Sequence, residues 1–232
     1  KPVTINTMGF FYGLDYSSFA GTVDFMGYDS YPEWGAKPDI EVALDTSFTF
    51  DYVRGFMNKN WSLMECTPSQ VNWHEICKLK RPGQHMLASM QALAHGSDTV
   101  MMFQWRKGRG GPEKFHGAVM GHDGTADTRT FREVTEVGEM LETLRPLVGS
   151  QTHSEVAVIY DQVNRWALDG AQGPMRDKEY PEVVFEHYRA LKTLNLNVDV
   201  IDSEKPLAGY KLVAAPYLYM IKPGVAEKLT RF

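Results

Sequence analysis

The hydrophobic and polar positions of the chain form short apolar runs that alternate with longer amphipathic stretches. The apolar runs predict strands over residues 3–8, 23–28, 61–65, 99–105, 156–160, 198–201 and 212–215. Apolar residues at helical spacing predict a helix over about residues 83–95, and further helices are predicted within residues 39–57 and over about residues 129–145 and 181–195. Because strands and helices that alternate in this way are typical of βαβ units, the pattern predicts an α/β fold with parallel sheets.

The alternation stops near residues 146–154 and then starts again, which divides the chain into two predicted domains. The first covers residues 1–148 and the second covers residues 149–232. The strand over residues 99–105 is apolar almost throughout, as is typical of a strand that is buried on both faces.

Composition narrows the class of protein. Hydrophobic residues make up 43% of the chain and charged residues 23%, which are ordinary values for a globular protein. The net charge is −5 and no block of Lys and Arg stands out, so we expect no nucleic-acid partner. No apolar stretch approaches the roughly 18 residues of a membrane span, so we expect no membrane partner either. The sequence leaves the localisation unknown, and we expect the cytoplasm.

Metal and cofactor signatures are missing from the sequence. The two cysteines, Cys66 and Cys77, form no C-x-x-C pair, and no Cys/His spacing fits zinc. His74-Glu75 is not followed by the second histidine of an H-E-x-x-H motif. The Gly-rich residues 108–111 lack the spacing of a dinucleotide or phosphate loop. We therefore expect no metal and no cofactor.

Polar and aromatic residues near the ends of the predicted strands are candidates for a site. Glu65 directly follows an apolar strand, and parallel α/β folds build their sites at the carboxyl ends of strands. Trp73 and Trp105 could each pack against a sugar ring or belong to the core. Glu113 and His116 lie in a Gly-rich loop that could bind a ligand or be simply solvated. Glu65 could equally cap the turn that follows it, so these residues alone leave the function open.

Longer motifs carry a more specific signal. Residues 63–69 (Leu-Met-Glu-Cys-Thr-Pro-Ser), 71–73 (Val-Asn-Trp) and 80–83 (Lys-Arg-Pro-Gly) resemble the nucleophile region of glycoside hydrolase family 42, the β-galactosidases. The resemblance continues in order through further motifs at residues 29–32 (Asp-Ser-Tyr-Pro), 94–98 (Ala-His-Gly-Ser-Asp), 103–106 (Phe-Gln-Trp-Arg) and 109–118 (Arg-Gly-Gly-Pro-Glu-Lys-Phe-His-Gly-Ala). Cys66 departs from the family, which usually has Gln at this position.

The resemblance implies a fold and an activity. Family members have a (β/α)₈ TIM barrel and hydrolyse terminal β-D-galactosides with retention of configuration, through a covalent glycosyl-enzyme intermediate. Residues 1–148 would supply strands 5–8, the C-terminal half of the barrel. Residues 149–232 would be the start of a flavodoxin-like α/β trimerisation domain, so the full-length protein is expected to be a homotrimer that binds a β-galactoside.

The resemblance also implies roles for individual residues. Glu65, at the end of barrel strand 7, would be the nucleophile. Family residues that line the sugar subsite match Trp73, Glu113 and His116. We expect the hydroxyl of Tyr31 to point at Glu65.

Two further positions complete the expected sugar subsite. Trp105, at the end of strand 8, would form its floor. Asn6, on strand 5, would face the same end of the barrel. We expect Cys66 to affect packing rather than chemistry, because neighbouring side chains on a strand point to opposite faces.

One part of the family's machinery has no match in the chain. The family's acid/base Glu follows an Asn, and the sequence contains no Asn-Glu pair. Glu113 is a poor substitute, since the resemblance gives it a binding role. We therefore expect a chain that carries the nucleophile, lacks the proton donor and is inactive alone. The alternatives are a non-catalytic galactoside-binding or assembly module, or an enzyme of the same type that acts on α-L-arabinopyranosides.

Overall fold

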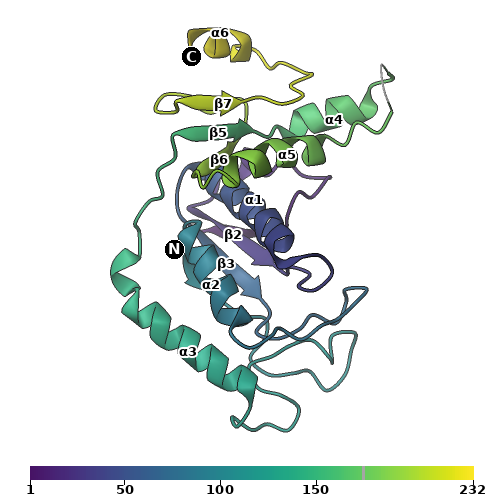
Figure 1. Cartoon of the computed structure of the whole chain (residues 1–232), viewed down its shortest axis with the longest axis vertical. Helices are drawn as coiled ribbons and strands as arrows, with labels where there is room; N and C mark the ends of the chain where they lie inside the picture. The colour runs from purple at the N-terminus through teal and green to yellow at the C-terminus, as the bar shows by residue number, and fades with distance from the viewer. Residues whose placement is uncertain (174–175) are drawn as a thin grey trace.

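The computed structural model describes residues 1–173 and 176–232, which form two parallel β-sheets with helices packed against them (Figure 1). The first sheet has the strand order β1-β2-β3-β4 and the second has the order β6-β5-β7. The strands of the first sheet are β1 (Thr4–Thr7), β2 (Phe25–Ser30), β3 (Trp61–Cys66) and β4 (Ser97–Val100). Those of the second are β5 (Val156–Ile159), β6 (Val198–Ile201) and β7 (Leu212–Ala214). All neighbouring strands pair in parallel, which confirms the predicted α/β class.

Six α-helices accompany the two sheets in the described part of the chain. They are α1 (Asp39–Met57), α2 (Gln84–Ala94), α3 (Arg129–Thr143), α4 (Gln162–Gly170), α5 (Tyr180–Lys192) and α6 (Val225–Arg231). Two short 3₁₀ turns, η1 (Tyr16–Phe19) and η2 (Arg145–Leu147), complete the described elements. No helix in the described part of the chain is both long enough and apolar enough to cross a membrane.

The prediction of a strand over residues 99–105 is wrong for its C-terminal part, because β4 ends at Val100. The backbone N–H of Phe103 still donates to the carbonyl of Cys66 at 2.9 Å. From Gln104 onward, however, the backbone pairs with residues 117–120 instead of with β3. Trp105 therefore lies beyond the strand and not at its end.

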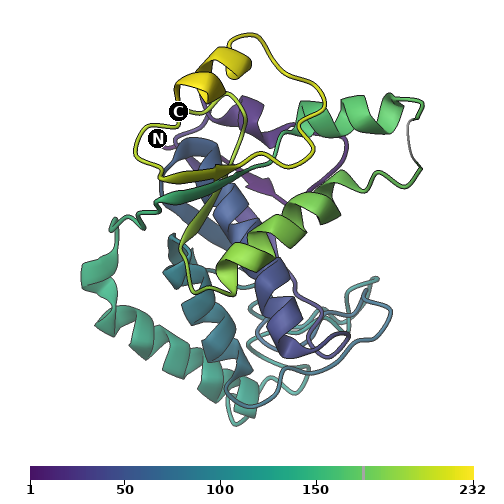
Figure 2. The ribbon, with the colours of Figure 1, turned by 45° about the horizontal axis from the view of Figure 1, so that its top comes forward.

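Helix α1 is buried between the two sheets. Figures 1 and 2 show it packed against β2 on one side and against β6 and α5 on the other, and close contacts join it to all three. Its buried aromatic side chains include Phe48, Phe50 and Phe56. The ring of Phe10, from the segment after β1, stacks on Phe48 at 4.7 Å between centroids. Side chains from both sheets thus pack around α1 in one hydrophobic core.

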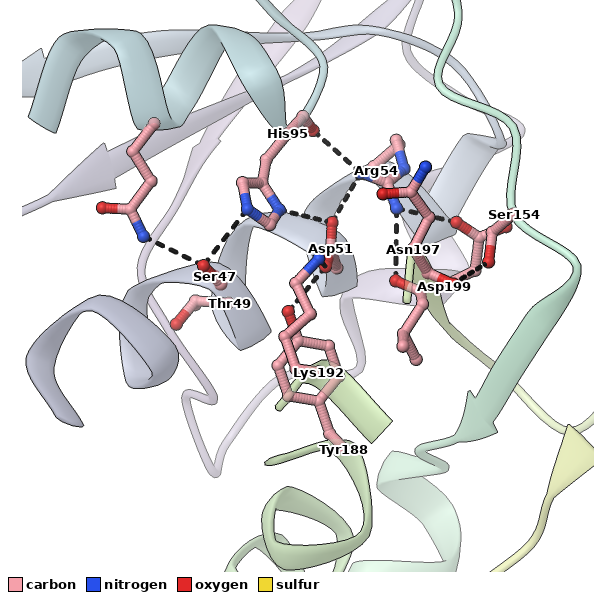
Figure 3. Close-up of polar contacts among 12 residues, drawn as sticks. Ser47, Thr49, Asp51, Arg54, His95, Ser154, Tyr188, Lys192, Asn197 and Asp199 are labelled. Atoms are coloured by element: carbon pink, nitrogen blue, oxygen red, sulfur yellow. Dashed lines mark hydrogen bonds and ion pairs between the residues drawn. The ribbon is translucent and has the colours of Figure 1, made fainter. Parts of the chain in front are cut away.

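A buried polar network also joins α1 to the second sheet (Figure 3). The guanidinium of Arg54 lies 2.5 Å from Asp51 and 2.7 Å from Asp199, which is on β6. Asp51 accepts hydrogen bonds from Tyr188 at 2.6 Å and lies 2.7 Å from the ring of His95. Burial opposes the charge on Asp51, but His95 and Arg54 outweigh it and lower the pKa of Asp51 to about 2.

Candidate active site at the carboxyl end of the first sheet

Glu65 is the penultimate residue of β3 and lies at the carboxyl end of the first sheet. The pairing of β2 with β3 is regular until Tyr28, which lies opposite Leu63, and then the register shifts by one residue. Because of this shift, Asp29 lies opposite Glu65 instead of opposite Met64. Irregularities of this kind are common beside active sites, where they change the direction of a side chain. Here the shift brings two carboxylates together on neighbouring strands.

Tyr31 holds the carboxylate of Glu65. Its hydroxyl donates a hydrogen bond to Oε2 of Glu65 at 2.7 Å, which is the orientation expected from the sequence. Burial and the neighbouring Glu65 raise the pKa of Tyr31, so its hydroxyl stays protonated and remains a donor. The ring of Tyr31 contacts Trp73 at 5.3 Å and His116 at 5.7 Å, each edge to face. Tyr31 therefore links the carboxylate to two of the predicted sugar-binding residues.

Asn6 contacts Asp29, the carboxylate opposite Glu65. The amide nitrogen of Asn6 lies 2.9 Å and 3.2 Å from the two carboxylate oxygens of Asp29. Burial and the charge of Glu65 raise the pKa of Asp29 to about 6, although the hydrogen bond from Asn6 acts in the opposite direction. The sequence reasoning missed Asp29 as a site residue. Its place at the end of a predicted strand, two residues before Tyr31, was the signal available.

A cavity of about 480 Å³ opens beside these residues. Its lining consists of Trp73, Phe103, Gln104, Gly108, Gly110, Gly111, Pro112 and Glu113. The Gly-rich loop rests on the segment that follows β3: Asn72 donates to the carbonyl of Pro112 at 2.5 Å, and the N–H of Gly117 donates to the carbonyl of Gln70 at 2.7 Å. The structure thus brings Trp73 and Glu113 together on one cavity.

His116 is fully buried behind Tyr31. The rings of Tyr31 and Phe103 meet it edge to face, with centroids 5.7 and 5.2 Å away. Neither ring nitrogen forms a hydrogen bond with the described residues. Burial lowers the pKa of His116, so the ring is neutral near pH 7 and keeps one donor and one acceptor.

Trp105 is not among the residues that line this cavity, although its neighbour Gln104 is. Its side chain is 62% exposed, and its ring lies 6.5 Å from Phe131 of α3. Because the backbone turns away from β3 before this residue, Trp105 is absent from the cavity lining. Its expected role as the floor of the sugar subsite stays a prediction.

Cys66 lies beside Glu65 but has different surroundings. Its thiol is buried and donates to the carbonyl of Met101 at 3.3 Å, and burial raises its pKa. Over residues 1–173 and 176–232, no three His, Cys, Asp or Glu side chains are grouped so that they could hold a metal ion.

The Glu65 carboxylate lies at the carboxyl end of a parallel sheet, which is where α/β-barrel enzymes build their active sites. Comparisons with known proteins identify the class of enzyme as a glycoside hydrolase. Residues 1–144 match the family model described as β-galactosidase, and residues 154–232 match the one described as β-galactosidase trimerisation domain. The chain belongs to glycoside hydrolase family 42.

Relatives of known name support the family. The chain is 51% identical to the β-galactosidase BglY of Alicyclobacillus acidocaldarius and 46% identical to the β-galactosidase Pbg of Clostridium perfringens. Each alignment covers 100% of this chain and 34% of the relative, so the chain spans about a third of their length. Among solved structures, the β-galactosidase of Rahnella sp. R3 aligns with a TM-score of 0.96 at 47% identity, again over 100% of this chain and 34% of that one. These relatives do not favour a non-catalytic module or an arabinopyranosidase.

Proposed function

We propose that the chain carries the nucleophile of a retaining β-galactosidase and that Glu65 is this nucleophile. The observation that supports it best is the 2.7 Å hydrogen bond from Tyr31 to Oε2 of Glu65 at the carboxyl end of the sheet. The hydrogen bond holds the carboxylate in one orientation and leaves Oε1 to attack the substrate.

The reaction proceeds in two steps. In the first, Oε1 of Glu65 attacks the anomeric carbon, the bond to the aglycone oxygen breaks, and the departing oxygen takes a proton from an acid. In the second, that residue acts as a base on a water molecule, which cleaves the galactosyl ester and frees Glu65. The acid/base residue lies outside this chain, because the chain has no Asn-Glu pair.

The sugar lies against the residues that surround Tyr31. Trp73 offers a ring face to the sugar, and Glu113 accepts hydrogen bonds from its hydroxyls. His116 is fully buried behind Tyr31 and acts on the sugar subsite through the position of the Tyr31 ring. Asn6 approaches from the neighbouring strand.

The four strands of the first sheet are strands 5–8 of the family barrel. Four parallel strands cannot close an eight-stranded barrel, so β1 and β4 remain as open edges in the chain alone. We assign residues 1–148 to the C-terminal half of the barrel and residues 149–232 to the start of a flavodoxin-like trimerisation domain, which would make the full-length enzyme a homotrimer.

The test compares the full-length enzyme with the 232-residue chain on nitrophenyl β-galactoside and follows the first-formed sugar by NMR. The full-length enzyme should release β-galactose first, and the chain alone should show no turnover. Release of α-galactose first would contradict the retaining mechanism. Normal turnover by the chain alone would contradict the missing acid/base.

A further inference from the structure

Asp29 has no part in the reaction as described above, although it lies opposite Glu65 across β2 and β3. We propose that ionised Asp29 is a positioning residue that acts through Glu65: its negative charge drives the nucleophile toward the uncharged ester. This inference rests on the proposed function and deepens it.

The packing of the site keeps Asp29, Asn6 and Glu65 close to one another. Gly27, two residues before Asp29 on β2, lies between β1 and β3. A Cβ at Gly27 would lie 2.6 Å from Cγ of Met64 and 3.3 Å from Oδ1 of Asn6. The absence of a side chain at Gly27 therefore leaves room for Asn6 beside β2, where its amide donates to both oxygens of Asp29. The amide fixes the orientation of Asp29 and stabilises its charged form.

The charges around Asp29 are unbalanced. The titratable neighbours that act on it or feel its charge are Glu65, Tyr31 and Tyr28, all of which are neutral or negative. Within the described residues, no Lys, Arg or His forms an ion pair with Asp29 or Glu65. Two carboxylates that lie together without a cation repel each other when both are ionised.

This repulsion has opposite effects on the two chemical steps. When Glu65 becomes an ester, one of the two negative charges disappears, so the repulsion favours formation of the intermediate. The transition state also gains positive charge on the sugar ring, which a second carboxylate stabilises. The second step also passes through a positively charged transition state, but it restores the repulsion, so ionised Asp29 accelerates the first step more than the second.

The test measures kcat/KM for the Asp29→Asn variant of the full-length enzyme on nitrophenyl β-galactoside at pH 7.5 and pH 5. At pH 7.5 Asp29 is ionised, and we expect kcat/KM of the variant to be on the order of tenfold below wild type. At pH 5 Asp29 is largely protonated, because its pKa is about 6, and the two enzymes should become nearly equal. A ratio that is the same at both pH values would mean a merely structural role and would overturn the proposal.

Two further variants separate the possible failures. Asp24→Asn removes a carboxylate just before the opposite end of β2, where Asp24 accepts from the N–H of Val3, and should leave kcat/KM unchanged. Glu65→Ala should be inactive at both pH values. If Glu65→Ala is inactive and the Asp29→Asn ratio does not depend on pH, only the role of Asp29 fails. If Glu65→Ala keeps full activity, the proposed function itself fails.

Discussion

Gly55 of α1 lies directly against the backbone of Val200 in β6. A Cβ placed on Gly55 would be 1.8 Å from the carbonyl oxygen of Val200, far inside any permitted contact. The helix of one sheet therefore meets the strand of the other backbone to backbone, and no side chain larger than hydrogen fits between them. This contact defines how closely the two sheets pack.

Substitution of Gly55 should weaken the whole chain. Gly55→Ala forces α1 and β6 apart, and we expect a loss of about 3 kcal/mol in the free energy of unfolding. Gly138→Ala is the matched control, because Gly138 is exposed in α3 with nothing within 4 Å of an added Cβ. Alanine is a better helix former than glycine, so Gly138→Ala should gain about 0.5–1 kcal/mol. Urea denaturation of both variants checks the prediction, which fails if they change stability in the same direction.

The ion pair between Arg54 and Asp199 gives a second prediction. Arg54→Met leaves Asp51 and Asp199 buried without this cation, which should lower the free energy of unfolding by about 3–5 kcal/mol. Lys211→Met breaks a pair of similar length, 2.7 Å to Glu155, whose side chains are 74% and 63% exposed. Surface pairs of this kind contribute about 1 kcal/mol or less. Equal losses in the two variants, measured by urea denaturation, would contradict the prediction that buried Arg54 stabilises the fold more than a surface lysine does.

Buried His85 predicts a dependence of stability on pH. His85 has no exposed surface, and neither of its ring nitrogens has a hydrogen-bond partner among the described residues. Burial and the nearby charge of Lys80 lower the pKa of His85 to about 3. Since the unfolded chain takes up this proton near pH 6.5 and the folded chain does not, stability is lost as the pH falls from 6.5 toward 3.

His85→Leu should remove that loss. Relative to wild type, we expect the variant to gain about 1.4 kcal/mol of stability for each pH unit below 6.5. Urea denaturation between pH 7 and pH 4.5 measures the difference. His187→Leu, at an exposed position of α5, should follow the wild-type curve. Parallel curves for wild type and His85→Leu would show that His85 is not held neutral.

Tyr31→Phe tests the support of Glu65, the proposed nucleophile. Loss of one oriented hydrogen bond to Glu65 should lower kcat/KM of the full-length enzyme about tenfold to a hundredfold. The phenyl ring keeps the contacts with Trp73 and His116, so the thermal unfolding temperature should stay within a few degrees of wild type. An unchanged kcat/KM on nitrophenyl β-galactoside would separate Tyr31 from the chemistry.

Much of the fold follows from local pattern. The helix predicted within residues 39–57 agrees with α1, and each strand of both sheets overlaps a predicted strand. Helix α4 was missed, because its polar start depends on a cap: Asp161 accepts from the N–H groups of Val163 and Asn164. The strand over residues 99–105 was overextended, because the pairing of Gln104 with residues 117–120 is a tertiary contact that no local pattern reveals.

The candidate site was predictable only in part. Family motifs pointed to Glu65 and to the hydrogen bond from Tyr31, because these residues end adjacent strands. Asp29 needed the structure, since its place opposite Glu65 depends on a one-residue register shift. A regular register between β2 and β3 would place Met64 opposite Asp29 instead. The predicted position of Trp105 at the end of a strand was wrong, because β4 ends at Val100.

The most direct test of the central claim is covalent trapping of the nucleophile. A 2-deoxy-2-fluoro-β-galactoside with a good leaving group forms the intermediate faster than it is hydrolysed, because the fluorine destabilises the positively charged transition states of both steps. Mass spectrometry of the peptic peptides of the full-length enzyme then locates the label. The account predicts one fluorogalactosyl group on Glu65, and a label on any other carboxylate would contradict it.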